Sequence, residues 1–167
     1  YKPCHTGNNP IMKIGNGILY AGGFSRGASH HDNMLLVDLT GSHYNQNVCS
    51  TIPTMFNSIE SIKHDGRDYI NLPIKDFDVP SMQAGFWREF SNDIKSYLET
   101  GKNILIACDG GHGRTGTVLC ILIGILQNDI LPIETVKKLY CKEVVETNAQ
   151  EDYIYSMINN EVYIPKI

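Results

Sequence analysis

The segment NILIACDGGHGRTGTVLCILIGIL, from Asn103 to Leu126, constrains the fold more than any other part of the chain. It begins with a short apolar run, passes through a glycine-rich loop and ends in a longer apolar run. This pattern predicts a buried strand over Asn103–Ala107 and a helix over about Arg114–Asn128, joined by a tight loop. In α/β proteins, ligands bind at such a loop between a strand end and a helix N-terminus. The segment therefore predicts both the fold class and the place of the functional site.

The rest of the chain alternates short apolar strands with amphipathic helices, which is typical of an α/β fold with a mostly parallel sheet. We predict strands over Ile18–Tyr20, Met34–Val37 and Arg67–Ile74, and helices over about Met82–Glu99, Ile133–Lys142 and Gln150–Asn159. Ser81 is the expected N-cap of the first of these helices, and Gly101 the residue just after its end. Asn45–Pro53 is predicted to be a polar loop, and the pattern of Ser58–His64 is ambiguous.

The composition is that of one globular domain, which we assign to residues 1–167 with residues 1–12 loosely ordered. A net charge of −4 argues against the broad basic surface that nucleic-acid binding needs. No signal peptide is visible, and the longest apolar run, Val118–Leu126, is about half as long as a membrane-spanning helix. We therefore expect a cytoplasmic monomer without a nucleic-acid or membrane partner.

The cysteines point to a reducing compartment rather than to structural cross-links. There are five of them, an odd number, and no two form a CxxC pair. This argues against a zinc site and against a complete disulfide framework, so we expect no bound metal and no cofactor. Cys120 lies in an apolar helical run and is expected to be an inert core residue.

The glycine loop allows three interpretations. Gly111, Gly113 and Gly116 match the G-x-G-x-x-G dinucleotide fingerprint, but only about fifty residues follow, and they look helical rather than like further βαβ units. A Walker A loop needs a lysine, and the loop has none. The third interpretation uses Cys108 and Arg114, which stand in the order C-x5-R.

The C-x5-R spacing suits an attack on a bound phosphate. A five-residue loop before a helix can turn its backbone N–H groups inward and bind an oxyanion, to which the helix dipole adds positive potential. Arg114 offers a planar fork for two phosphate oxygens, and the same field favours the thiolate form of Cys108. The residues expected to surround the phosphate are Asp109, Gly110, Gly111, His112, Gly113 and Gly116. The alternative, a buried cysteine with a helix-capping arginine, explains neither the glycines nor Thr115.

The segment CDGGHGRTG resembles the C-x5-R-[S/T]-G signature of the protein tyrosine phosphatase superfamily, and the short chain is similar to its compact dual-specificity branch. The resemblance implies a twisted, mostly parallel sheet with helices on both sides, and hydrolysis of phosphomonoesters through a phosphocysteine. It gives Thr115 the task of stabilising the departing thiolate. It also requires an aspartic acid about thirty residues before the cysteine, and in "LPIKDFDVPS" the family's frame selects Asp76 over its rival Asp78.

The sequence departs from the family pattern at three places. Ala107 stands where a histidine usually precedes the cysteine, and the carboxylate of Asp109 opposes thiolate formation unless it points away. Near the C-terminus, "ETNAQ" resembles a glutamine loop in which Glu146 replaces the first glutamine. Gln150 matches the second and either places water or begins a helix.

The remaining histidines do not suggest a site of their own. His112 lies inside the loop and faces either the substrate or solvent. The others are scattered in polar segments: His5, His30, His31, His43 and His64. We interpret His30-His31-Asp32 as surface loop, because adjacent residues rarely converge on one metal ion. Arg26 is a candidate pocket residue that the sequence alone does not place.

The expected function is hydrolysis of phosphotyrosine in proteins, with phosphoserine and phosphothreonine as further substrates. The loop lacks the lysines of the phosphoinositide-specific branch, which argues against a lipid substrate. Two alternatives stay open. One is an RNA 5′-phosphatase, against which the acidic balance weighs, and the other is a phospho-binding module without turnover.

Overall fold

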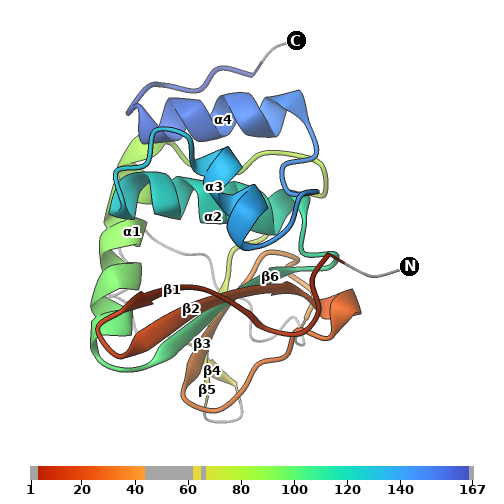
Figure 1. The fold of residues 1–167 in the computed structure, drawn as a ribbon, viewed down its shortest axis with the longest axis vertical. Helices are drawn as coiled ribbons and strands as arrows, with labels where there is room; N and C mark the ends of the chain where they lie inside the picture. Colours follow the sequence, from red (N-terminus) through yellow and green to blue (C-terminus); the bar gives the residue numbers. More distant parts are fainter. Residues whose placement is uncertain (1–3, 44–61, 65–66, 166–167) are drawn as a thin grey trace.

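The fold is an α/β structure built on one six-stranded sheet (Figure 1). The computed structural model describes residues 4–43, 62–64 and 67–165. The strands are β1 Asn9–Ile14, β2 Gly17–Gly23, β3 Met34–Asp38, β4 Ile62–His64, β5 Arg67–Asn71 and β6 Asn103–Cys108. The helices are η1 Phe24–Arg26, α1 Ala84–Glu99, α2 Gly113–Leu126, α3 Pro132–Leu139 and α4 Asn148–Ile158. Within these residues, no helix is long and apolar enough to span a membrane.

The sheet is parallel at its centre and antiparallel at its edges. Its order is β1-β2-β6-β3-β5-β4. Strand β6 pairs in parallel with β2 and β3, and β3 pairs in parallel with β5. The hairpin partners β1 and β4 add antiparallel strands at the two ends. The predicted α/β class with a mostly parallel sheet is confirmed, and β6 carries the glycine loop at its carboxyl end.

Side chains of the central strands alternate between two apolar clusters. On β6, Ile104, Ile106 and Cys108 belong to the large core, while Leu105 and Ala107 belong to a smaller cluster on the opposite face. This alternation follows from the pleat of the strand, which points successive side chains to opposite faces. It places the Cys108 side chain on the same face as the large core and the helices.

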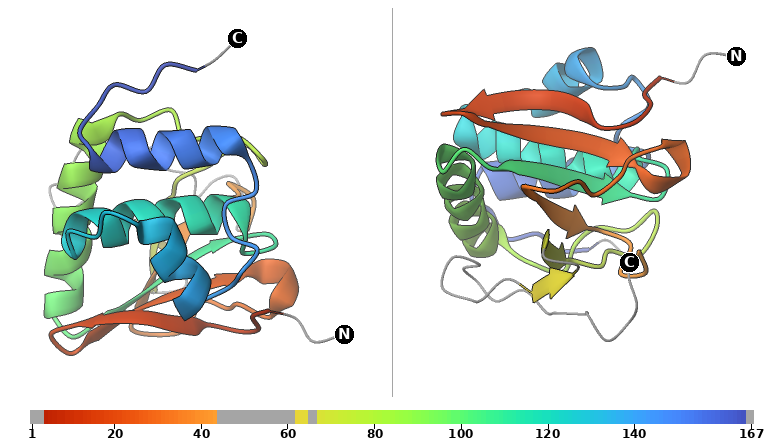
Figure 2. Two further views of the ribbon diagram at one scale, coloured as in Figure 1. Left: turned by 45° about the horizontal axis from the view of Figure 1, so that its top comes forward. Right: turned by 90° about the horizontal axis from the view of Figure 1, so that it is seen from below.

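All four α-helices of the described chain lie on one face of the sheet (Figure 2). Helices α1 and α2 pack against the strands, and α4 packs against α2 and α1. The sequence predicted helices on both faces, and the described residues do not bear this out. The opposite face is covered in part by Phe24 and Ala28, from the segment between β2 and β3.

The helix ends agree with the sequence only in part. Gly101 adopts a φ of 89° and its N–H bonds the carbonyl of Leu98, as predicted for a residue that ends a helix. The predicted N-cap Ser81 is wrong, because α1 begins at Ala84 with Gln83 as its N-cap residue and no side-chain cap. The hydroxyl of Ser81 contacts the sulfur of Met82 instead.

Over residues 4–12 the described N-terminal segment makes defined contacts, so the expectation of a loose segment is wrong for those residues. Strand β1 starts at Asn9, the side chain of His5 is buried, and the N–H of Gly7 bonds the carbonyl of Arg26. The predicted loop Asn45–Pro53 lies outside the described residues, and of the ambiguous segment only Ile62–His64 is described, as β4.

The approach of β2 to the glycine loop leaves room for glycine alone at position 23. A Cβ on Gly23 would lie 2.4 Å from the carbonyl carbon of Gly110 and 2.7 Å from the N of Gly111. We predict that Gly23→Ala lowers the free energy of unfolding by about 1–3 kcal/mol, because the backbone of the loop must move. Urea denaturation measures the change.

The matched control is Gly85→Ala at an exposed position of α1, where nothing lies within 4 Å of the added Cβ. It is expected to raise stability by up to about 1 kcal/mol, since alanine favours the helix. Equal effects of the two substitutions would show that the contact between β2 and the loop is not tight.

Candidate active site

The loop between β6 and α2 places a cysteine, an arginine and a threonine together. Strand β6 ends at Cys108, and α2 begins at Gly113, so Arg114 and Thr115 lie in the first turn of the helix. We call residues 108–114 the signature loop. Gly111 adopts a φ of 79°, and a Cβ there would lie 2.6 Å from His5 and 2.8 Å from the N of Gly23. Both constraints require glycine at this position.

Two hydrogen bonds converge on the sulfur of Cys108. The N–H of Gly111 donates to Sγ over 3.2 Å, and the hydroxyl of Thr115 donates to it over 3.1 Å. Cys108 is only 2% exposed, and Thr115 is fully buried. Two donors aimed at one sulfur fix its position at the bottom of the loop.

The guanidinium of Arg114 lines the same pocket as Cys108, and one of its N–H donors lacks an acceptor. One terminal nitrogen donates to the carbonyl of Ile74 over 3.2 Å. Nε is buried, has no hydrogen-bond partner among the described residues, and lies 3.6 Å from Oδ1 of Asp76. Arg114 is 8% exposed, so this donor has given up solvent without full compensation. An oxyanion in the pocket would supply the missing acceptor.

These side chains line a small pocket of about 140 Å³. Its lining consists of Asp76, Phe77, Cys108, Asp109, Gly110, His112, Gly113, Arg114 and Glu146. Four of the residues predicted to surround a phosphate line this pocket together with Cys108 and Arg114. They are Asp109, Gly110, His112 and Gly113. Gly111 and Gly116 do not line the pocket. Gly116 packs against Val144, where a Cβ would lie 2.7 Å from that side chain.

The structure separates the two aspartates that competed for the acid role. Asp76 lines the pocket of Cys108 and faces Arg114. Asp78 lines a different hollow, formed with α4 and the C-terminal segment, and its carboxylate accepts from the N–H of Val79. Of these two aspartates, Asp76 is the one that lines the pocket of Cys108.

Comparison with known proteins finds similarity to phosphatases. Residues 45–126, just under half of the chain, match the family model "Polymorphic toxin system, DSP-PTPase phosphatase". The structure of Tk-PTP in its active form matches with a TM-score of 0.60 over 90% of this chain and 97% of that chain, at 21% identity. This chain is thus similar in sequence to a dual-specificity and tyrosine phosphatase family, and it shares the fold of a solved tyrosine phosphatase. The predicted resemblance is confirmed.

Further similar proteins are found by structure and by sequence. DUSP15 matches with a TM-score of 0.61 over 92% of this chain and 88% of that chain, at 14% identity, which shows the fold alone. Two proteins of Methanocaldococcus jannaschii are similar in sequence: MJECL20, 34% identical over 54% of this chain, and MJ0215, 36% identical over 50%. The aligned parts span 60% and 50% of the lengths of these two relatives, both described as uncharacterized.

The signature loop is held from outside by residues that sequence reasoning missed. Ser25 donates to the carbonyl of Asp109 through both its N–H and its hydroxyl, over 2.9 and 2.8 Å. The hydroxyl of Tyr140 donates to the carbonyl of Gly111 over 2.7 Å. Burial, and then the charge of Cys108, raise the pKa of Tyr140, so it stays a donor. No local sequence signal marks these contacts, which join distant parts of the chain.

The three departures from the family pattern have structural explanations. The side chain of Ala107 points to the opposite face of the sheet, into the smaller cluster. Asp109 is exposed, so solvent screens its charge from Cys108. Gln150 lies in the first turn of α4 and caps it. Its Oε1 accepts from the N–H groups of Glu146 and Thr147, and its own N–H donates to the hydroxyl of Thr147 in a capping box.

Two smaller predictions are also settled by the geometry. His30 is buried and bonds the carbonyl of Met34 through Nε2, so its interpretation as a surface residue is wrong. Arg26 is not among the residues that line the pocket of Cys108. It lies close enough to His5 to help lower the pKa of that histidine.

The capping role of Gln150 can be separated from a role in the reaction. We predict that Gln150→Ala lowers the free energy of unfolding by about 1 kcal/mol, because two backbone N–H groups lose their acceptor. Gln150→Glu keeps the acceptor and is expected to retain most of the stability. Urea denaturation compares them. If the two variants were equally destabilised, the bond from Gln150 to the carbonyl of Asp78 would be the important contact.

Proposed function

We propose that this protein hydrolyses phosphomonoesters through a phosphocysteine on Cys108, with phosphotyrosine in proteins as the preferred substrate. Phosphoserine and phosphothreonine are further substrates. The observation that carries the proposal is the pocket in which the sulfur of Cys108, the guanidinium of Arg114 and the carboxylate of Asp76 meet.

In the first step the sulfur of Cys108 attacks phosphorus, an S–P bond forms, and the bond from phosphorus to the leaving oxygen breaks. Arg114 and the backbone N–H groups of the signature loop hold the equatorial oxygens, whose charge the N-terminus of α2 also stabilises. Asp76 delivers its proton to the leaving oxygen. The unsatisfied Nε of Arg114 is the donor that the phosphate would engage.

In the second step water attacks phosphorus, Asp76 accepts its proton, and the S–P bond breaks to release phosphate. The hydroxyl of Thr115, already 3.1 Å from Sγ, donates to the departing thiolate. Arg114 and the helix N-terminus supply the positive charge at each stage. The proposed reaction therefore requires no metal ion.

An exposed aromatic residue supports an aryl phosphate as substrate. Phe77 follows Asp76, lines the pocket and is 59% exposed. A phenyl ring beside the acid can pack against the ring of phosphotyrosine, which alkyl phosphates lack. The loop carries no lysine, and the net charge is −4, so neither a lipid headgroup nor RNA is the proposed substrate.

We predict that Cys108→Ser abolishes turnover of p-nitrophenyl phosphate while phosphotyrosine peptides still bind, because Arg114 and the loop backbone survive. Steady-state hydrolysis and calorimetric peptide binding measure the two effects. Near-full activity in the variant would exclude Cys108 as the nucleophile. A wild-type protein that binds phosphopeptides without turnover would instead be a phospho-binding module.

We predict that Asp76→Asn slows hydrolysis of phenyl phosphate by about 10²–10⁴-fold, because its leaving group needs protonation. The loss should be much smaller for p-nitrophenyl phosphate, whose leaving group is better. Asp78→Asn is the matched control, since its side chain lies in the other hollow. A larger loss in Asp78→Asn than in Asp76→Asn would reassign the acid.

A further inference from the structure

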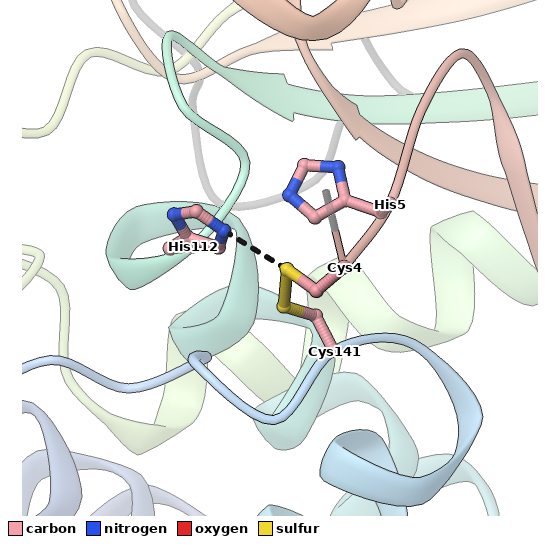
Figure 3. Close-up of side chains that lie close together, drawn as sticks. All are labelled: Cys4, His5, His112 and Cys141. Carbon is pink, nitrogen blue, oxygen red and sulfur yellow. Dashed lines mark hydrogen bonds between the residues drawn. A yellow bond between two sulfur atoms is a disulfide. The ribbon is translucent and has the colours of Figure 1, made fainter. Parts of the chain in front are cut away.

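Four potential metal ligands meet beside the signature loop. They are Cys4 and His5 from the N-terminal segment, His112 from the signature loop, and Cys141 from the segment after α3 (Figure 3). Their ligand atoms all lie within 4.8 Å of one another. In the structure Cys4 and Cys141 form a disulfide with a Cα–Cα distance of 5.4 Å, and Nε2 of His112 lies 3.3 Å from Sγ of Cys4. The sequence did not predict this disulfide.

His5 is buried, and its ring nitrogens lack hydrogen bonds of good geometry, although the backbone of Gly110 lies close to the ring. It is 4% exposed, and neither Nδ1 nor Nε2 has a hydrogen-bond partner among the described residues. Its ring stacks on Tyr140 and meets the edge of His112 at a centroid distance of 4.9 Å. Burial, followed by the nearby His112 and Arg26, lowers the pKa of His5 to about 4. A buried imidazole with both nitrogens unpartnered carries an uncompensated desolvation cost, which a bound ion would offset.

We propose that, when the two cysteines are reduced, Cys4, His5, His112 and Cys141 bind one zinc-class divalent metal ion. Two thiolates and two imidazoles form the S₂N₂ donor set that suits tetrahedral Zn²⁺. In such a site the ligand atoms lie roughly 3–4 Å apart, which follows from metal–ligand bonds of about 2.0–2.3 Å. Modest movement of the four side chains brings them to that spacing once the sulfur atoms separate.

The charges around the cluster favour a cation. Two thiolates neutralise a divalent ion, and the carboxylate of Glu143 lies 3.5 Å from Nε2 of His112. Cys4 is exposed and His112 is half-buried, so an ion can enter from solvent on their side. The argument from sequence against a zinc site concerned local CxxC spacing, whereas these cysteines are 137 residues apart.

Metal occupancy and the disulfide exclude each other, because a sulfur in a disulfide is not a thiolate ligand. Either one joins the N-terminal segment to the segment after α3. In the disulfide form His112 contacts Sγ of Cys4, whereas the metal would bind His112 directly; this histidine precedes α2 and lines the pocket of Cys108. The reduced, metal-bound form would therefore hold the signature loop from one more side.

The test uses the Cys108→Ser variant, in which the nucleophile cannot bind metal. The protein is reduced with a phosphine, stripped with a chelator and titrated anaerobically with Co²⁺. We expect one equivalent of Co²⁺ to produce thiolate-to-cobalt charge-transfer absorption, which one equivalent of Zn²⁺ removes. These readouts do not depend on turnover, so failure of the proposed function would leave this test intact.

Substitutions of the proposed ligands test which residues bind the metal ion. Cys4→Ser and His5→Gln are each expected to weaken Co²⁺ binding at least tenfold, whereas His31→Gln and Cys120→Ala leave it unchanged. Cys4 is exposed, so its replacement should not unfold the protein, which far-ultraviolet circular dichroism checks. Reduced protein that gives no charge-transfer band, or an equal band in Cys4→Ser and His5→Gln, would overturn the proposal and leave the cluster a disulfide only.

Discussion

The hydrogen bonds from Gly111 and Thr115 to the sulfur of Cys108 are the interaction on which the site depends. They exist because β6 ends at Cys108 and the chain turns within four residues into α2. That turn requires the left-handed backbone of Gly111. It also requires β2 to approach so closely that Gly23 has no room for a side chain. The central position of β6 in the sheet thus fixes where the sulfur lies.

The signature loop is not rigid through its own contacts alone. Ser25, Tyr140 and His5 hold it from η1, from the segment after α3 and from the N-terminal segment. Thr115 adds a long hydrogen bond to the carbonyl of Gly22. Preorganised donors of this kind need no rearrangement when a charged group enters the pocket. This arrangement is a physical reason why Ala107 can replace the histidine that usually precedes the cysteine.

The sequence was informative wherever local pattern determines structure. The apolar runs of β3 and β6 and the glycine loop were predicted because burial on both faces and tight turns leave strong local signals. The N-terminal segment was wrongly predicted to be loose. Its contacts with Arg26, Tyr140 and Cys141 are not local in sequence, so they leave no pattern in the segment itself. Ser81 failed as a cap because the chain enters the helix three residues later. The family's frame in the sequence already favoured Asp76 over Asp78, and the structure adds that Asp76 lies 3.6 Å from Arg114.

The most direct test of the account is to look for the phosphocysteine itself. Rapid acid quenching of the wild-type protein during hydrolysis of an aryl phosphate, followed by peptide mass spectrometry, locates any phosphate bound to the chain. The account predicts phosphate on Cys108, formed within the first turnover and lost as product appears. Turnover without any phosphorylated cysteine, or with phosphate on another residue, would contradict it.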